Sequence, residues 1–145
     1  MSRIVAEART WLGTPYRHQM SLKGVGCDCI GLVRGVWREV VGPEPASLPP
    51  YSPDWAEVCG QDWLLAGLGA HFQPVSVGQA QAGDVIAFRM KPGALAKHAA
   101  ILSAGGLAAS DARLIHAYWG HAVVESWLNP FWRQRVVGAF RFPLI

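Results

Sequence analysis

Apolar residues in the first third of the chain recur every three to four positions, which is the spacing of an amphipathic helix. The pattern predicts one helix over residues 3–12, ended by Gly13, and a second helix that starts at Asp28 or Cys29. Gly42-Pro43 is typical of a helix C-terminus and ends the second helix. Its apolar face is broad, so we expect it to be a buried central helix.

Two irregular segments flank this central helix. Residues 14–28 are predicted to form a loop, and the prolines in residues 42–53 indicate an extended, irregular connection. Asp54 is followed three residues later by Glu57, a spacing typical of a helix-capping box. A third helix is therefore predicted from Asp54 to about Leu68.

The second half of the chain changes to short runs of strand-forming residues separated by turns. Five strands are predicted, over residues 85–88, 98–103, 113–118, 121–126 and 136–142. Helices followed by strands favour an α+β fold with an antiparallel sheet of about five strands, in place of βαβ winding. We predict a single domain over residues 1–145, with the N-terminal helices packed on this sheet.

Composition agrees with one folded domain. Of 145 residues, 51% are hydrophobic and 16% are charged, which excludes a disordered chain. No apolar run approaches the ~18 residues needed to cross a bilayer, and no internal repeat is present. The net charge is +3, but the basic residues are scattered, so a nucleic-acid interface is not expected. This charge suits an anionic substrate or an acidic partner protein.

The cysteines offer one candidate nucleophile. Cys27, Cys29 and Cys59 do not suggest a disulfide framework, and no zinc-ligand spacing is present, so no metal or other cofactor is predicted. Cys29 stands at the start of the central helix, where backbone N–H groups and the helix dipole lower a thiol pKa. The alternative is a small buried hydrophobe, the usual fate of a free cysteine. We interpret Cys27 as a bystander and Cys59 as a core residue.

A cysteine nucleophile needs a base and a residue that orients it. His98 and His116 lie on two consecutive predicted strands, 18 residues apart, around a turn-rich hairpin tip. If they oppose each other directly, their Cβ atoms are roughly 5 Å apart and both rings share the sheet face beside Cys29. Each histidine alone is also compatible with a hydrogen-bonded sheet residue. The remaining histidines lie in or beside predicted loops, where a solvated role is expected: His18, His71 and His121.

Several segments resemble the NlpC/P60 family of cysteine peptidases, in the same order along nearly the whole chain. The resembling segments are residues 12–16 (LGTPY), 26–33 (GCDCIGLV), 82–88 (AGDVIAF), 98–102 (HAAIL) and 114–117 (LIHA). Each piece is weak alone, but the ordered set is specific. The proline-rich loop and residues 132–139 are further similar to the phage-tail branch of the family, which includes gene-transfer-agent peptidases.

The resemblance implies a papain-like fold, with Cys29 as nucleophile, His98 as base and His116 as the residue that orients the base. Family members cleave peptidoglycan stem peptides, commonly between D-γ-glutamate and a diamino acid, without a cofactor. The resemblance also implies that Tyr16 and Asp28 hold the free amine of the substrate. Asp28 stands equally well where a helix N-cap is expected, and Tyr16 where a loop aromatic would pack.

The chain departs from the family pattern at Ile30, which replaces a serine common after the catalytic cysteine and is expected to alter the substrate pocket. The N-terminus lacks a signal-peptide pattern, so synthesis in the cytoplasm is expected. The resemblance then suggests transport on a phage-like tail, with a tail hub or tip protein as partner and the periplasm of the target cell as the place of action. Two alternatives stay open: a structural tail-tip protein with a vestigial peptidase fold, and a papain-like amidase or acyltransferase.

Overall fold

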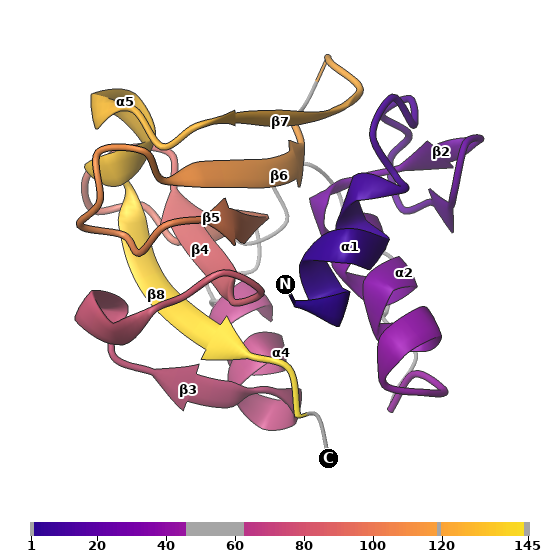
Figure 1. Ribbon diagram of the computed structural model, residues 1–145, viewed down its shortest axis with the longest axis horizontal. Helices are drawn as coiled ribbons and strands as arrows, with labels where there is room; N and C mark the ends of the chain where they lie inside the picture. The colour runs from indigo at the N-terminus through magenta and orange to yellow at the C-terminus, as the bar shows by residue number, and fades with distance from the viewer. Residues whose placement is uncertain (1, 46–62, 119, 144–145) are drawn as a thin grey trace.

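The computed structural model describes residues 2–45, 63–118 and 120–143. In these residues, helices flank an antiparallel sheet (Figure 1). The elements are α1 (Arg3–Arg9), β1 (Ser21–Leu22), β2 (Gly26–Cys27), α2 (Cys29–Val40), α4 (Trp63–His71), β3 (Gln73–Val75), the 3-10 helix η1 (Val77–Gln79), β4 (Val85–Arg89), β5 (Ala96–Ala104), β6 (Arg113–Ala117), β7 (Val123–Trp127), α5 (Pro130–Arg133) and β8 (Val136–Arg141). The predicted α+β class and the papain-like arrangement of helices on an antiparallel sheet are confirmed.

The main sheet has six strands in the order β3-β8-β4-β5-β6-β7, and every neighbouring pair is antiparallel. All five predicted strands are present, with ends that differ by a few residues. The sixth strand, β3, is only three residues long and contains Pro74, which hides it from a pattern search. It lies at the sheet edge, the position where a proline in a strand is tolerated.

Two predictions need correction, and one short helix was not predicted. The segment 14–28 is not a plain loop, because β1 and β2 form a two-stranded hairpin within it. The N-terminal part of the third predicted helix and Cys59 lie outside the described residues. In the described part, α4 does not end near Leu68 but continues to His71, since a solvent-exposed glycine at position 69 is tolerated in a helix at modest cost. The short helix α5 is missed because four residues carry no periodicity.

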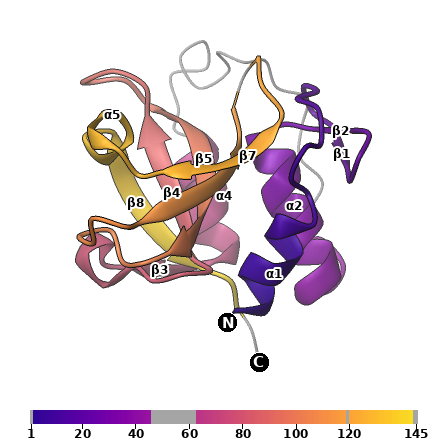
Figure 2. The ribbon, with the colours of Figure 1, turned by 45° about the horizontal axis from the view of Figure 1, so that its top comes forward.

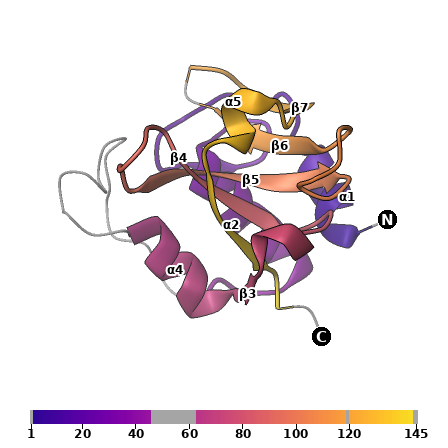
Figure 3. The same cartoon turned by 90° about the vertical axis from the view of Figure 1, so that its left-hand side faces the viewer.

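Two hydrophobic clusters lie on opposite faces of the sheet, because side chains alternate along each strand. Figure 2 shows α1 and α2 against one face, whereas α5 lies across the other face. The first cluster joins Leu32 and Val36 of α2 to Ile101 and Ile115 of the sheet. It also includes Leu64 and Leu68 of α4, which lies along the same side of the domain (Figure 3). The second cluster is smaller and centres on Phe88, Leu102, Leu114 and Trp132.

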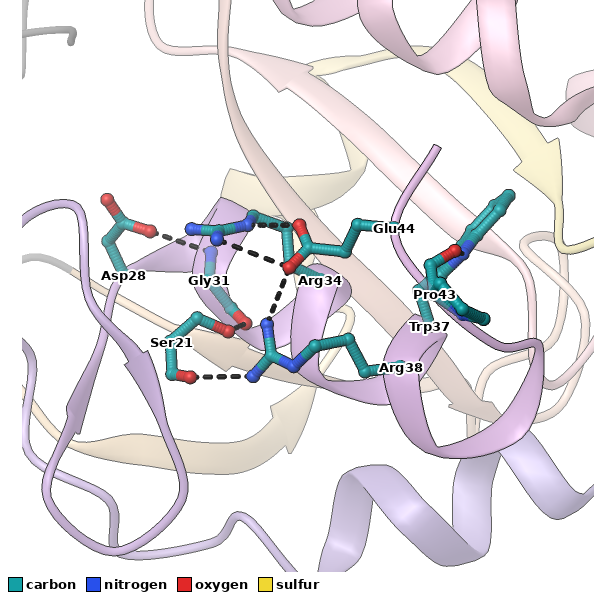
Figure 4. A network of polar contacts seen from close by, with 8 residues as sticks. All are labelled: Ser21, Asp28, Gly31, Arg34, Trp37, Arg38, Pro43 and Glu44. Carbon is teal, nitrogen blue, oxygen red and sulfur yellow. Dashed lines mark hydrogen bonds and ion pairs between the residues drawn. The ribbon is translucent and has the colours of Figure 1, made fainter. Parts of the chain in front are cut away.

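A network of arginines fixes α2 on its exposed side (Figure 4). Arg34 and Arg38 of α2 both donate hydrogen bonds to Glu44, which follows the helix, at distances of 2.6–3.3 Å. Arg38 also donates to the backbone carbonyl of Ser21, and the Ser21 hydroxyl donates to the Gly31 carbonyl, both at 2.6 Å. Hydrogen bonds therefore join α2 both to the β1–β2 hairpin and to the segment that follows α2.

Candidate active site

Asp28 caps the N-terminus of α2 and thereby sets the position of Cys29. Its Oδ1 atom accepts a hydrogen bond from the Gly31 N–H at 2.7 Å, and its Oδ2 atom accepts one from the Gln19 N–H at 2.7 Å. The residue is 2% exposed, and its carboxylate also lies 3.8 Å from Nδ1 of His18. The N-cap interpretation of Asp28 is confirmed, and the second oxygen additionally ties the loop before β1 to the helix start.

Cys29 begins α2, and its thiol reaches the central strand of the sheet. The sulfur accepts hydrogen bonds from the backbone N–H groups of Ala99, Ile30 and Cys29 itself. Because Ala99 follows His98 directly on β5, the thiol lies beside the strand segment that bears the predicted base. The structure thus brings Cys29 to the residue that follows His98, although the two predicted site residues are 69 positions apart in sequence.

The pKa of the Cys29 thiol is shifted in the direction opposite to the one expected from its position at the helix start. Burial, followed by the nearby Asp28 carboxylate, raises the pKa of Cys29 to about 12. The backbone N–H donors lower it, as the helix-start argument requires, but their effect is smaller than the cost of removing a thiolate from water. The same two causes raise the pKa of the fully buried Cys27 to about 12.

His98 and His116 form a buried hydrogen-bonded pair. Nε2 of His98 lies 2.8 Å from Nδ1 of His116, and the ring centroids are 5.1 Å apart. The strands pair with Ile101 opposite Ile115, and continuing this register places Ala100, not His98, opposite His116. The two histidines are therefore cross-strand neighbours, as predicted, but they stand diagonally, because the observed register is displaced by two residues from the one that would pair them directly.

Both rings pack against Trp132, which belongs to the second hydrophobic cluster. That His98 and His116 share the sheet face beside the Cys29 thiol stays a prediction. Trp132 stacks on His98 with 5.0 Å between centroids, and Tyr118 contacts both imidazoles at 5.7 and 6.0 Å. The Cys29 thiol lies at the backbone N–H of Ala99, the residue after His98, and the aromatic rings pack against the two imidazoles.

The surroundings keep both histidines uncharged at neutral pH. Burial, followed by the neighbouring His116, lowers the pKa of His98 well below its usual range. Burial also lowers the pKa of His116 to about 4, with a smaller contribution from His121. A neutral imidazole has one N–H donor and one acceptor nitrogen, so each ring can orient its neighbour without adding a charge.

The residues expected to contact substrate lie around the helix start. Tyr16 is half-buried and pairs with Cys27 in a backbone bridge. Burial, followed by Cys29 and Asp28, raises the pKa of its phenol, which places the ring close to both residues. Ile30 is partly buried against the main hydrophobic cluster, directly after Cys29. The sequence did not predict that both oxygens of Asp28 accept backbone hydrogen bonds.

Two further residues at this site, Ser126 and Trp132, were not predicted to contact the histidines. Ser126 contacts His116, with 3.0 Å between its Oγ atom and Nε2 of His116. Trp132 lies in the four-residue helix α5, and its contact with His98 depends on chain folding across 34 positions. Of the other histidines, His18 lies near Asp28, His121 stacks on Tyr118 at 5.4 Å, and His71 ends α4 and is exposed.

A free cysteine at the start of a central helix and a histidine pair on an antiparallel sheet define a papain-like α+β domain with a cysteine–histidine site. The chain belongs to the NlpC/P60 family, which it matches over residues 13–141. The match covers both halves of the site and most of the sheet.

Solved structures agree with this assignment. The chain is 28% identical to the NlpC/p60 domain of the peptidoglycan hydrolase SagA, with a TM-score of 0.66 and 97% of each chain covered. It is 27% identical to an NLP/P60 family protein similar to a lipoprotein from Staphylococcus aureus subsp. aureus Mu50, with a TM-score of 0.59 over 95% of this chain and 39% of that one. An NlpC/P60 family protein from Bacillus cereus ATCC 10987 shares the fold, with 22% identity and a TM-score of 0.66 over 97% of this chain and 39% of that one.

The chain therefore spans about two fifths of the staphylococcal and Bacillus proteins and nearly all of the SagA domain. No curated protein matches the chain. Within residues 2–45, 63–118 and 120–143, no helix is long and apolar enough to cross a membrane. The same residues contain no group of three or more His, Cys, Asp or Glu side chains placed to hold a metal ion.

Proposed function

We propose that this protein is a cysteine endopeptidase that cleaves peptidoglycan stem peptides at the bond between D-γ-glutamate and a diamino acid. The observation that carries the proposal is the hydrogen bond from Ala99 to the Cys29 thiol, beside a His98 ring that is held by His116. The NlpC/P60 family and the likeness to the SagA hydrolase domain support wall peptides as the substrate class.

In the proposed reaction Cys29 is the nucleophile and His98 the base. Because burial raises the pKa of the thiol and lowers that of the imidazole, both groups are neutral before substrate binds. The thiol proton therefore passes to Nδ1 of His98 as the sulfur attacks, since Nε2 is engaged by His116. A C–S bond forms at the γ-glutamyl carbonyl, and the C=O electron pair moves onto oxygen, where backbone N–H groups at the start of α2, including that of Cys29, stabilise the charge.

The remaining steps restore the enzyme. The tetrahedral intermediate collapses with cleavage of the C–N bond, and the His98 imidazolium gives its proton to the leaving amine. A water molecule then attacks the thioester while His98 accepts its proton. Cleavage of the C–S bond releases the carboxylic acid, and the proton on His98 returns to the sulfur of Cys29.

Substrate recognition is assigned to residues around the helix start. Tyr16 lies close to Cys29 and Asp28, so its half-buried phenol is placed to contact a substrate amine near the nucleophile. Asp28 adds negative charge there, although both of its oxygens already accept backbone hydrogen bonds. Ile30 contributes an apolar wall beside the nucleophile.

The test is cleavage of defined muropeptides, with fragments identified by mass. Wild-type protein should release fragments that end at D-γ-glutamate, and Cys29→Ala should release none. Cys27→Ala is the matched control, because it removes a neighbouring buried thiol without removing the nucleophile. Fragments from a different amide bond would contradict the bond assignment, transfer products would indicate an acyltransferase, and absence of any product from folded wild-type protein would contradict the enzyme.

The delivery route is a separate proposal, supported by the resemblance of residues 132–139 to the phage-tail branch. We propose that a phage-like tail hub or tip protein carries the enzyme to the periplasm of the target cell. The protein should then co-purify with intact tail particles in a fixed ratio. Recovery only as free protein, separate from particles, would contradict this route.

A further inference from the structure

Three polar side chains form a continuous line across β5, β6 and β7. Nε2 of His98 lies 2.8 Å from Nδ1 of His116, and Nε2 of His116 lies 3.0 Å from Oγ of Ser126. His116 is 2% exposed, so both of its ring nitrogens are satisfied within the protein. Ser126 is only half-buried and lies at the outer end of the line.

The strand register explains why Ser126 reaches His116. On β6 and β7, His116 lies opposite Val124 and Leu114 lies opposite Ser126. Ser126 therefore shares the sheet face of His116 and is displaced from it by two residue pairs along the strands. The intervening Glu125 projects from the other face, where it accepts hydrogen bonds from Arg9. On β7, Val124 and Ser126 therefore face the side of the sheet that carries His116, and Glu125 does not.

The direction of the hydrogen bonds along this line decides whether His98 can act as a base. If Ser126 Oγ accepts a hydrogen bond from Nε2–H of His116, then Nδ1 of His116 carries no proton and accepts one from Nε2–H of His98. Nδ1 of His98 is then an unprotonated acceptor. With the opposite direction, His98 carries its proton on Nδ1 and cannot accept one from a thiol.

We propose that Ser126 is a positioning residue that selects the productive direction, by accepting the Nε2 proton of His116 and so leaving Nδ1 of His98 unprotonated. The inference rests on the proposed role of His98 as the base and extends the assigned residues by one. The serine acts through His116 and contacts neither the thiol nor the substrate.

The aromatic residues around the pair support this role. Trp132 stacks on His98 at 5.0 Å and meets His116 edge-on at 5.1 Å, so neither ring can turn over without displacing it. The imidazoles then cannot exchange the positions of their two nitrogens by rotation. Which nitrogen carries the proton is therefore determined by the hydrogen-bond partners of each ring. Because burial lowers the pKa of His116, a second proton on this ring does not compete at neutral pH.

The experiment compares wild-type protein with Ser126→Ala and Ser126→Thr. Threonine keeps the hydroxyl and suits a β-strand, whereas alanine removes the acceptor. Ser103→Ala is the matched control: it also removes a serine hydroxyl that bonds a side chain in the same sheet, the Glu125 carboxylate at 2.8 Å, but it does not contact the histidines. The readouts are the 15N shifts of the imidazole nitrogens, which report the protonated nitrogen of each ring, and the kinetics of muropeptide cleavage.

Wild-type protein should show the proton on Nε2 of both His98 and His116, without any substrate present. Ser126→Ala should show a mixture of proton positions on His116 and a kcat about three- to tenfold lower, the usual effect of one lost hydrogen bond, with an unchanged KM. Ser126→Thr and Ser103→Ala should retain the wild-type shifts and kcat.

A wild-type spectrum with the proton on Nδ1 of His116 overturns the proposal, and so does a Ser126→Ala protein with wild-type shifts and kcat. The spectra do not depend on turnover. A wild-type protein that shows the expected shifts but cleaves no muropeptide therefore contradicts the proposed function. The same shifts still support Ser126 as the acceptor of the Nε2 proton of His116.

Discussion

Nε2 of His98 lies 2.8 Å from Nδ1 of His116, although the two residues are not opposite each other in the strand register. The diagonal arrangement lets the two rings meet at an angle of 63°, with one nitrogen of each directed at the other. A directly opposed pair would place the rings side by side across the strands. Because Nε2 of His98 faces His116, the proposed mechanism assigns the thiol proton to Nδ1.

The first prediction concerns the unequal roles of the two histidines. His98→Ala should lower kcat by about 10²- to 10⁴-fold, because no side chain then accepts the thiol proton or protonates the leaving amine. His116→Asn and His116→Gln should retain far more activity than His116→Ala, since an amide can still accept a hydrogen bond from His98. Muropeptide cleavage and thermal melting of each variant provide the measurement. Wild-type turnover by folded His98→Ala would refute the base assignment, and equal losses for His116→Asn and His116→Ala would refute the orienting role.

The second prediction concerns acid stability. The pKa of His116 in the folded protein is about 4, below the ordinary value of 6.5, so the unfolded chain binds a proton in this range that the folded state does not. The free energy of unfolding should fall as pH falls from 6.5 to 4, by up to about 1.4 kcal/mol per pH unit for this group. The pKa of His98 is lowered in the same direction and adds to the slope.

His116→Gln should therefore flatten the dependence of stability on pH, which urea unfolding at pH 7 and pH 5 can measure. His71→Gln is the control, because His71 is exposed at the end of α4 and its loss should leave the slope as in wild-type protein. A His116→Gln protein with the full wild-type slope would show that His116 is not held uncharged by burial.

The third prediction concerns thiol reactivity. Iodoacetamide reacts with the thiolate, and the pKa values of Cys27 and Cys29 are both raised to about 12. In a Cys59→Ala background, both thiols should react slowly at pH 6, and their rates should increase about tenfold per pH unit from pH 7 to 9. Rapid labelling of Cys29 that is already constant near pH 6 would instead demonstrate a thiolate–imidazolium pair in the resting enzyme.

The sequence predicted the parts of the site that depend on local structure. A capping aspartate before an apolar periodic run located the start of α2, and with it Cys29. The register of β5 against β6 was not predictable, because it depends on an irregularity near the hairpin loop. The direction of the Cys29 pKa shift was missed for a related reason: a helix start is visible in sequence, but the burial that outweighs it is created by the packing of α2 against β5.

The aromatic and hydroxyl partners of the histidines could not be predicted either. Trp132 reaches His98 from a four-residue helix that has no periodic pattern, and Ser126 reaches His116 only in the observed register. Both contacts join separate elements of the sheet face, and the resemblance of residues 132–139 to the phage-tail branch assigns Trp132 no partner.

The last prediction contrasts two helical glycines. Gly35 of α2 faces Trp11, which follows the end of α1, and a Cβ atom at this position would overlap the Trp11 indole. That indole is 2% exposed, and its Nε1 donates a hydrogen bond to Glu7 at 3.1 Å, so it cannot move aside without losing a contact. Gly67 lies within α4, is exposed, and has no atom within 4 Å of a Cβ at its position.

Gly35→Ala should therefore destabilise the protein by about 1–3 kcal/mol, the usual cost of overpacking a core. Gly67→Ala should stabilise it by about 0.5–1 kcal/mol, because alanine loses less conformational freedom than glycine on entering a helix. Urea unfolding of both variants measures the two effects against wild-type protein in one experiment. Stabilisation by Gly35→Ala would show that α1 and α2 do not approach as closely as described, and would weaken the account of how the helix that bears Cys29 is seated on the sheet.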